Sequence, residues 1–429
     1  MKKLFKNIVV AIITFEARML LLRTRPKIIG ITGSVGKTST KDAIYSVITK
    51  KVHARKSEKS FNSEIGVPLT VLGLPNAWSN PFMWIKNIVD GAIVACFPGK
   101  YPEWLVLEIG VDRPGDIGAI VSWLKPDIAV LTRLPDVPVH VEYFASPEAV
   151  IAEKRQLVDA LTPEGVLVFN NDDEKVVEIK NSIRQQSIGF SRYSLSPFTA
   201  SADKVIYEKG VPAGLEFILT HDAEATVVSV PGSLGVQHAY SYAAAVAVGS
   251  LFGMSIQDSA YALRAHMPPP GRMRLIEGIK NTLIIDDTYN SSPVALKSAL
   301  QTLKEIRTFG RKIVVLGDMM ELGQYSVLEH EKAGHDVVEV ADILFTVGVR
   351  ARGIAEGALA MGMHESKIFQ YEDARTAGKE LEMMLESDDV VLIKGSQSIR
   401  AERIVEEIMA HPENAGELLV RQDSMWQSI

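Results

Sequence analysis

The stretch KIIGITGSVGKTS, residues 27–39, decides the fold around it, because it joins an apolar strand, a glycine-rich turn and the start of a helix. Gly33 and Gly36 allow backbone amides to approach an anion, and Lys37 can reach the β- and γ-phosphates of a nucleotide. Thr38 offers a hydroxyl to Mg²⁺, and a helix expected over residues 41–49 points the positive end of its dipole at the same place. The stretch therefore predicts a nucleoside triphosphate site, with the candidate residues Gly33, Ser34, Gly36, Lys37, Thr38 and Ser39.

The spacing departs from the strict form of this phosphate loop at one position. The strict form has a glycine five residues before Gly36, where this chain has Ile31. A variant loop is therefore expected. The alternative is a strand-to-helix turn that binds nothing, and the apolar strand, the Gly-Lys-Thr sequence and the following helix together favour the phosphate site.

Length and composition exclude several classes of protein. With 429 residues the chain has room for about two or three domains. A content of 47% hydrophobic and 23% charged residues and a formal net charge of −6 argue against disorder and against a general nucleic-acid-binding surface, so small molecules are the expected partners. Cys96 is the only cysteine, which excludes an intramolecular disulfide and fits a cytoplasmic protein. Its apolar neighbours predict that its side chain is buried.

Two interpretations of the apolar segment 1–26 stay open. The apolar run over residues 8–15 is interrupted by Glu16 and Arg18 well before the roughly 20 residues that a membrane span needs. Basic residues at positions 2, 3 and 6 resemble the start of a signal peptide, but no small-residue cleavage site follows. The segment is either a helix packed on the nucleotide-binding part, which we favour, or an interfacial helix that holds the protein at a membrane surface.

Alternating apolar runs and amphipathic stretches predict an α/β fold. Strands are expected over residues 104–108, 128–132 and 166–169, in a mostly parallel sheet with helices on both faces. Residues 190–232 contain short alternating runs that predict an antiparallel patch at one edge of the sheet. A helix is expected over residues 237–251.

The segment Met267-Pro-Pro-Pro-Gly271 cannot continue a helix and predicts a domain junction. After it, strands are expected over residues 282–286, 312–317, 343–347 and 390–394, as in a small Rossmann-like α/β domain. No GxGxxG follows these strands, so nicotinamide or flavin binding is unsupported. The predicted organisation is an apolar segment at 1–26, a central P-loop ATPase domain at 27–268 and a C-terminal domain at 269–429.

Polar side chains follow several predicted strands, where the chemistry of open parallel sheets takes place. Glu108 ends one strand, His140 lies in the loop after the next, and Asp286, Asp287 and Asp318 end two strands of the C-terminal part. Beside a triphosphate, such groups are reasonable Mg²⁺ ligands or neighbours of the ligands. The alternatives are a helix cap for Glu108 or Asp318 and an exposed loop position for His140.

Seven motifs in a fixed order over residues 27–410 resemble those of the Mur ligases, and the resemblance is specific for ATP-dependent amide ligases. They are the phosphate loop, Phe61-Asn-Ser-Glu-Ile-Gly-Val-Pro68, Glu108-Ile-Gly110, His140-Val-Glu-Tyr-Phe144, Asp286-Asp-Thr-Tyr-Asn-Ser-Ser-Pro293, Leu316-Gly-Asp-Met-Met-Glu-Leu-Gly323 and Lys394-Gly-Ser396.

The resemblance implies that a substrate carboxylate attacks the γ-phosphate of ATP and that an amine then attacks the acyl phosphate, with Mg²⁺ present. The expected reaction adds D-alanyl-D-alanine to a UDP-muramyl peptide. It implies catalytic roles for Lys37, His140, Lys154 and Arg272, with Lys154 carbamylated. It also implies metal sites at Thr38, Glu108, His140 and Lys154, nucleotide contacts from Asp287, Tyr289, Asn290 and Pro293, and substrate contacts from Asn62, Lys394, Ser396 and Arg400.

Some positions depart from the pattern of the Mur ligases. The phosphate loop begins near residue 30, which leaves no room before it for the separate domain that grips the UDP-sugar in muramyl ligases. Asp112 and Ser241 stand where asparagine is usual, and residues 132–136 form an altered loop before His140. These departures bear on the UDP-muramyl peptide more than on ATP or amide formation.

Two alternatives to a muramyl-peptide ligase therefore stay open. One is a ligase of the same fold that acts on another carboxylate, as folylpolyglutamate-synthetase-like enzymes do, although their signatures are absent here. The other is a non-catalytic nucleotide-binding scaffold. The expected location is the cytoplasm, with a membrane contact through residues 1–26 as the second interpretation of that segment.

Overall fold

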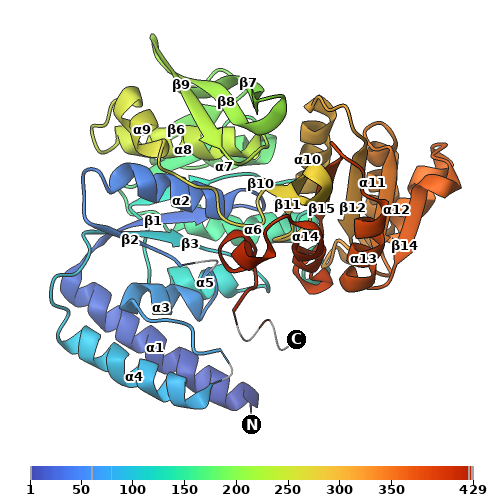
Figure 1. Cartoon of the computed structure of the whole chain (residues 1–429). Coiled ribbons are helices and arrows are strands. Elements are labelled where there is room, and N and C mark those ends of the chain that lie inside the picture. The colour runs from blue at the N-terminus through green and yellow to red at the C-terminus, as the bar shows by residue number, and fades with distance from the viewer. Residues whose placement is uncertain (1, 59–60, 79, 424–425, 427–429) are drawn as a thin grey trace.

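The computed structural model describes residues 2–58, 61–78, 80–423 and 426. They build two β-sheets, each with helices on both faces (Figure 1). The expected α/β class, with one large and mostly parallel sheet and a second α/β unit, is confirmed.

The first sheet has nine strands in the order β2-β3-β1-β4-β5-β6-β7-β8-β9. Strands β2 to β7 pair in parallel, and β7, β8 and β9 pair antiparallel at one edge. The expected antiparallel patch is thus confirmed for residues 198–231, whereas residues 186–191 extend the parallel part. The strands are β1 (Lys27–Thr32), β2 (Ala54–Lys56), β3 (Trp104–Glu108), β4 (Ile128–Leu131), β5 (Val166–Asn170), β6 (Gln186–Ser191), β7 (Phe198–Glu208), β8 (Val211–His221) and β9 (Glu224–Pro231).

Apolar side chains of the helices form a separate core on each face of this sheet. One core includes α2 (Lys37–Ile48), α8 (Gln237–Ser250) and α9 (Ile256–Leu263). The other face is covered by α1 (Lys2–Thr24), α3 (Gly66–Leu72), α4 (Pro81–Cys96), α5 (Asp116–Val121) and α6 (Pro147–Asp159), with α7 (Glu174–Asn181) packed beside β5. The helix expected at 41–49 begins earlier, at Lys37, which places its first turn directly at the phosphate loop.

The second sheet has six strands in the order β10-β11-β15-β12-β13-β14, all parallel except the edge pair β10–β11. Its strands are β10 (Arg274–Gly278), β11 (Thr282–Asp287), β12 (Lys312–Gly317), β13 (Ile343–Val347), β14 (Ile368–Tyr371) and β15 (Val390–Lys394). The four expected strands are present. Its helices are α10 (Pro293–Glu305), α11 (Ser326–Val338), α12 (Arg352–Ala360), α13 (Ala374–Met384), α14 (Glu402–Ile408) and α15 (Ala415–Leu418).

The N-terminal segment is a helix that packs on the protein, as favoured from the sequence. In α1, Val9, Ile13 and Leu20 are buried in a core that also contains Ile28 of β1. Within the described residues, no helix is both long enough and apolar enough to cross a membrane. The expectation of a buried Cys96 is wrong, because the thiol is exposed at the end of α4.

Candidate active site

The phosphate loop is held in shape by backbone conformations that require glycine. Gly33 has φ 139° and Gly36 has φ 83°, and both values are strained for other residues. A Cβ atom on Gly33 would lie 2.0 Å from Oγ1 of Thr132. The Ser34 N–H donates to the carbonyl of Arg133 at 2.8 Å, which ties the loop to the end of β4. Ile31, at the position of the missing glycine, is fully buried, so the variant position belongs to the core.

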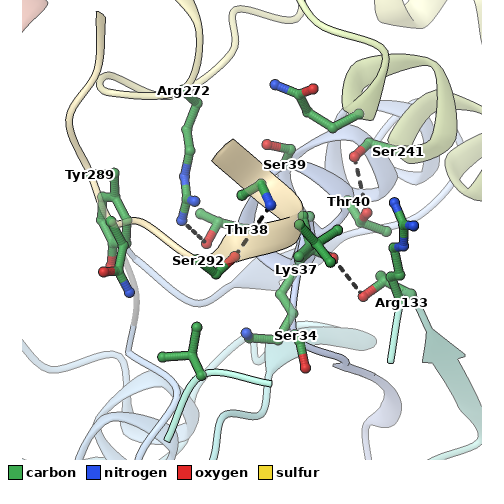
Figure 2. Close-up of a pocket in the computed structure, with 18 of the residues that line it drawn as sticks. Ser34, Lys37, Thr38, Ser39, Thr40, Arg133, Ser241, Arg272, Tyr289 and Ser292 are labelled. Carbon is green, nitrogen blue, oxygen red and sulfur yellow. Dashed lines mark hydrogen bonds between the residues drawn. The ribbon is translucent and has the colours of Figure 1, made fainter. Parts of the chain in front are cut away.

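A cavity of about 340 Å³ lies where the phosphate loop faces the C-terminal unit. Figure 2 shows Lys37, Thr38 and Ser39 at the start of α2, with Arg272 and Tyr289 facing them from the other unit. The N-terminus of α10, capped by Ser292, also lines the cavity. Most predicted site residues line this one space: Ser34, Gly36, Lys37, Thr38, Ser39, Asn62, Glu108, His140, Arg272, Asp287, Tyr289, Asn290 and Lys394.

Glu108, at the end of β3, connects two of the sequence motifs. Its Oε2 accepts a hydrogen bond of 2.9 Å from the Thr38 hydroxyl, and its Oε1 accepts one of 3.0 Å from the Asn62 amide. The carboxylate is 2% exposed. An anionic oxygen therefore lies beside the hydroxyl of the phosphate loop, and Glu108 caps no helix.

Basic groups surround the same space. The Arg272 Nη2 lies 3.4 Å from Oγ1 of Thr38, and its guanidinium stacks 4.0 Å from the ring centre of Tyr289. Burial lowers the pKa of the Lys37 ammonium, while the Glu108 carboxylate opposes that shift. Lys37 and Arg272 thus offer basic groups to a polyanionic ligand, while the carboxylate of Glu108 lies beside them.

Lys154 does not line the cavity but lies buried behind it on α6. Burial, followed by the positive charge of Lys37, holds the pKa of Lys154 well below its ordinary value. Burial therefore favours the neutral amine of Lys154 over its ammonium form.

His140 lies between the two units, in a left-handed conformation with φ 72°. Its Nδ1 is 2.6 Å from Oε2 of Glu321, which follows β12, and its Nε2 is 3.7 Å from Oδ1 of Asp112. The imidazole lowers the pKa of Glu321 by hydrogen bonding. Glu321 lies in a motif noted in the sequence, but its contact with His140 depends on the packing of the two units.

The carboxyl end of the second sheet supplies a buried ion pair. Lys394 Nζ lies 2.6 Å from Oδ2 of Asp287 and donates to the carbonyl of Asn290 at 2.9 Å. Arg421 donates to the backbone carbonyls of Thr288 and Tyr289 and so holds this loop. No sequence signal pointed to Arg421, because it lies beyond the last motif.

A second cleft of about 930 Å³ adjoins the cavity and shares Asp112, His140 and Asn290 with it. Ser396 and Arg400, predicted for substrate, line this cleft instead. Arg400 Nε donates to Glu402 at 2.5 Å.

Four further candidates line neither cavity: Gly33 of the phosphate loop, Pro293, Asp286 and Asp318. Pro293 is the first residue of α10, and its neighbours Ser292 and Val294 line the nucleotide cavity. Asp286 accepts from the Gly271 N–H at 3.1 Å, and burial raises its pKa to about 6. Asp318 accepts from the Ala351 N–H at 2.7 Å, just before α12.

The residues fit a nucleoside triphosphate and a hard cation. The Oγ of Ser34 and the Nε of Arg272 are buried without a partner in the described structure, and phosphate oxygens would satisfy both. Thr38 and Glu108 offer hard oxygens, which Mg²⁺ combines with phosphate oxygens and water. Among the described residues, no three His, Cys, Asp or Glu side chains form a metal site alone. A cation would therefore depend on ligands from the nucleotide.

Family comparisons agree with this geometry. Residues 31–249 match the model of the Mur ligase middle domain, and residues 271–397 match that of the Mur ligase glutamate ligase domain. The UDP-N-acetylmuramoyl-tripeptide–D-alanyl-D-alanine ligase of Bacillus subtilis is 28% identical, over 92% of this chain and 79% of the relative. The ligase of the same name from Mycobacterium leprae is 30% identical, over 87% of this chain and 71% of the relative.

Solved structures show the same architecture. The MurF ligase of Thermotoga maritima in complex with ADP has a TM-score of 0.75 and 26% identity, and covers 93% of this chain and 83% of its own. The folylpolyglutamate synthase of Mycobacterium tuberculosis, complexed with ADP, has a TM-score of 0.65 over 93% of this chain and 94% of its own. Its identity is 18%, so it shows the fold alone.

Proposed function

The chain belongs to the Mur ligase family, and from this premise we propose that it is an ATP-dependent ligase that joins D-alanyl-D-alanine to a UDP-muramyl peptide. The observation that carries the proposal is the single cavity in which the phosphate loop meets Arg272, Asp287 and Lys394 of the C-terminal unit. Relatives at 28% and 30% identity bear the name of this activity.

The reaction needs two transfers. A substrate carboxylate oxygen attacks the γ-phosphorus of ATP and ADP leaves; the amine nitrogen then attacks the acyl carbon, loses a proton and expels phosphate. Positioning and charge neutralisation supply most of the acceleration of phosphoryl transfer. Lys37, the loop amides and Arg272 would bind the phosphates, while Asp287 and Asn290, with Tyr289 and Pro293, would face the nucleoside.

We assign a Mg²⁺ ion to Thr38 and Glu108, because their oxygens lie 2.9 Å apart beside the phosphate loop. When bound, Mg²⁺ neutralises charge on the phosphates. Binding it would replace the hydrogen bond between these two side chains. His140 is placed at the edge of this site, where Glu321 orients its ring.

We also propose that Lys154 is carbamylated. Its lowered pKa favours the neutral amine, which is the form that attacks CO₂, and the resulting carbamate supplies an anionic oxygen beside Lys37. NMR of the protein in ¹³C-bicarbonate tests this. We expect a carbamate signal that Lys154→Ala abolishes and Lys125→Ala, at an exposed position, retains. A spectrum without that signal would exclude the modification.

The second cleft is our proposed place for the amine and for the end of the peptide. Ser396 and Arg400 line it, Asn62 and Lys394 line the adjoining cavity, and the residues shared by the two spaces connect them. The alternative carboxylate, a folylpolyglutamate-like substrate, has support only from the fold of a structure at 18% identity.

We also propose how the two units move, where the protein meets its substrates and what segment 1–26 contacts. The units 27–268 and 269–429 act as domains that close on ATP, because each has its own sheet and cores. The partners are small molecules, met in the cytoplasm. Segment 1–26 contacts the membrane surface that faces the cytoplasm.

Oxygen transfer tests the mechanism directly. With ¹⁸O in the carboxylate of the muramyl tripeptide, we expect one ¹⁸O atom in each phosphate released, since the carboxylate oxygen ends on phosphorus. Lys37→Ala should release none. Unlabelled phosphate accompanied by turnover would contradict an acyl phosphate.

A further inference from the structure

The outer surface of helices α1 and α4 is apolar and exposed. Figure 1 shows the two helices side by side at the margin of the molecule, on the side away from the second sheet. Phe82 and Phe97 are each 80% exposed, and Leu22 is 75% exposed. Nine of the 23 large hydrophobic side chains that the described structure exposes lie here: Phe5, Ile8, Phe15, Leu22, Phe82, Ile85, Val89, Ile93 and Phe97. We call these nine residues the hairpin patch.

The hairpin patch is separate from the face that each helix already buries. Helix α4 turns Trp84, Gly91 and Ala95 inward. Its patch residues follow at spacings of three or four, which place them on the opposite face of the helix. Helix α1 likewise buries Val9 and Ile13 and exposes Ile8 and Phe15. Both helices are therefore apolar on two sides, and only one of these sides packs in the core.

Charge around the hairpin patch has the opposite sign to the protein as a whole. Residues 1–26 contain six basic residues and one acidic residue, Glu16, whereas the chain carries a formal net charge of −6. Glu16 is itself buried, at 6% exposure. On α4, Lys86 is paired with Asp90 at 2.5 Å, so the positive charge near the patch comes from the N-terminal segment. An anionic surface is the complementary partner, and a second copy of the same face would meet like charge.

We infer that the hairpin patch docks on a lipid bilayer that contains anionic lipids, with α1 and α4 lying in the plane of the headgroups. Phenylalanine and aliphatic side chains enter the boundary between headgroups and acyl chains, and basic side chains remain at the headgroups. The geometry extends the membrane contact proposed for segment 1–26 to α4, which supplies four of the nine patch residues, and to Phe97 directly after it.

Docking would also place the substrate cleft near the bilayer. Lys6 of α1 lines the second cleft together with His140 and Ser396. It lies one residue from Phe5 of the hairpin patch. The cleft mouth and the docking surface are thus continuous, although the docking itself does not depend on ligase activity.

Sedimentation with vesicles tests this inference on the full chain. We expect the protein to sediment with phosphatidylglycerol-containing vesicles and to bind phosphatidylcholine vesicles at least about tenfold more weakly. The triple variant Phe82→Gln, Ile85→Gln, Val89→Gln should reduce binding to anionic vesicles by about tenfold or more, since three apolar side chains no longer enter the lipid.

The matched control is Val327→Gln, Leu328→Gln, which changes exposed apolar residues of α11 far from the hairpin patch and should leave binding unchanged. Circular dichroism and ATP binding of each variant verify that it folds. Absence of binding to anionic vesicles, or equal loss in the control, would overturn the inference. So would a dimer in light scattering that the triple variant dissociates, because the patch would then cover a second copy.

Discussion

Glu108 is the residue on which the proposed chemistry most depends, because its two oxygens join the phosphate loop to the motif around Asn62. Its charge also opposes the effect of burial on the pKa of Lys37. Burying the Glu108 carboxylate beside the half-buried Lys37 ammonium costs hydration free energy that a bound ligand can offset. The site is therefore arranged around charges that a metal nucleotide would complete.

Replacing the carboxylate by an amide tests that role. We expect Glu108→Gln to reduce the turnover of ATP by about 100-fold or more, since it removes one anionic oxygen without changing the size of the side chain. Glu103→Gln is the control, because Glu103 is exposed just before the opposite end of β3. Steady-state phosphate release measures both. Equal phosphate release by the Glu108→Gln and Glu103→Gln variants would contradict this role of Glu108.

The phosphate loop also makes a steric prediction. Gly33→Ala should destabilise the protein by roughly 1–3 kcal/mol, because the residue has φ 139° and its new Cβ would meet Thr132 at 2.0 Å. Gly99→Ala, at φ 56° with nothing within 4 Å of the Cβ, should cost less. Thermal unfolding compares the two variants, and a larger loss for Gly99→Ala would contradict this account of the loop.

At the scale of elements, helix α1 carries a buried acid against α4. A Cβ atom on Gly91 of α4 would lie 2.2 Å from Oε2 of Glu16, so the helices approach closely at this pair. Oε2 has no partner in the described structure. Burial raises the pKa of Glu16 to about 7. The folded protein therefore favours the protonated acid, which carries no charge into the contact.

This shift predicts how stability depends on pH. Because the folded protein retains the Glu16 proton that the unfolded chain loses above pH 4.5, stability falls as pH rises from about 4.5 to about 7. Glu16→Gln should therefore stabilise the protein at pH 8, by up to about 3 kcal/mol, and have little effect at pH 4. Unfolding midpoints at the two pH values test this, and a constant difference would refute it.

The elements differ in how well the sequence predicted them, for physical reasons. Strands such as β3 and β11 are short apolar runs bounded by polar turns, which is a local signal. Helix α4 gave no such signal, since its exposed face is apolar as well as its buried face, and for the same reason apolar neighbours do not mark Cys96 as buried. Strand β10 pairs with β11 across the domain junction, so its existence depends on tertiary contacts.

The candidate site likewise combines a motif that the sequence predicts with contacts that depend on tertiary packing. The phosphate loop is a continuous sequence, and the apolar strand, the Gly-Lys-Thr sequence and the following helix together predict it. The contact of Glu321 with His140 and the support of Tyr289 by Arg421 join segments far apart in the chain. Only the packing of the two units brings these groups together.

At the scale of the whole molecule, the two units meet at the nucleotide cavity and at a second point on the β7–β8 hairpin. Tyr207 of β7 accepts a hydrogen bond of 2.9 Å from the Arg307 N–H. At the cavity, Arg272 follows the junction and reaches Thr38 in the other unit. Closure of the units would therefore assemble the phosphate site.

Replacing Arg272 tests whether closure of the two units assembles the phosphate site. If Arg272 neutralises the transferred phosphoryl group as proposed, Arg272→Ala should lower phosphate release on the order of 10³-fold. The thermal midpoint should change little, since the side chain faces the cavity. Arg264→Ala, at an exposed position before the junction, is the control. Full activity of Arg272→Ala would show that closure does not bring this residue to ATP.

The measurement that tests the central claim most directly is phosphate release from ATP with UDP-muramyl-tripeptide and D-alanyl-D-alanine supplied together, singly or not at all. The account predicts release only when both are present, with a muramyl pentapeptide as product and no release by Lys37→Ala. Release that needs neither substrate, or ATP binding without release in any mixture, would contradict a muramyl-peptide ligase.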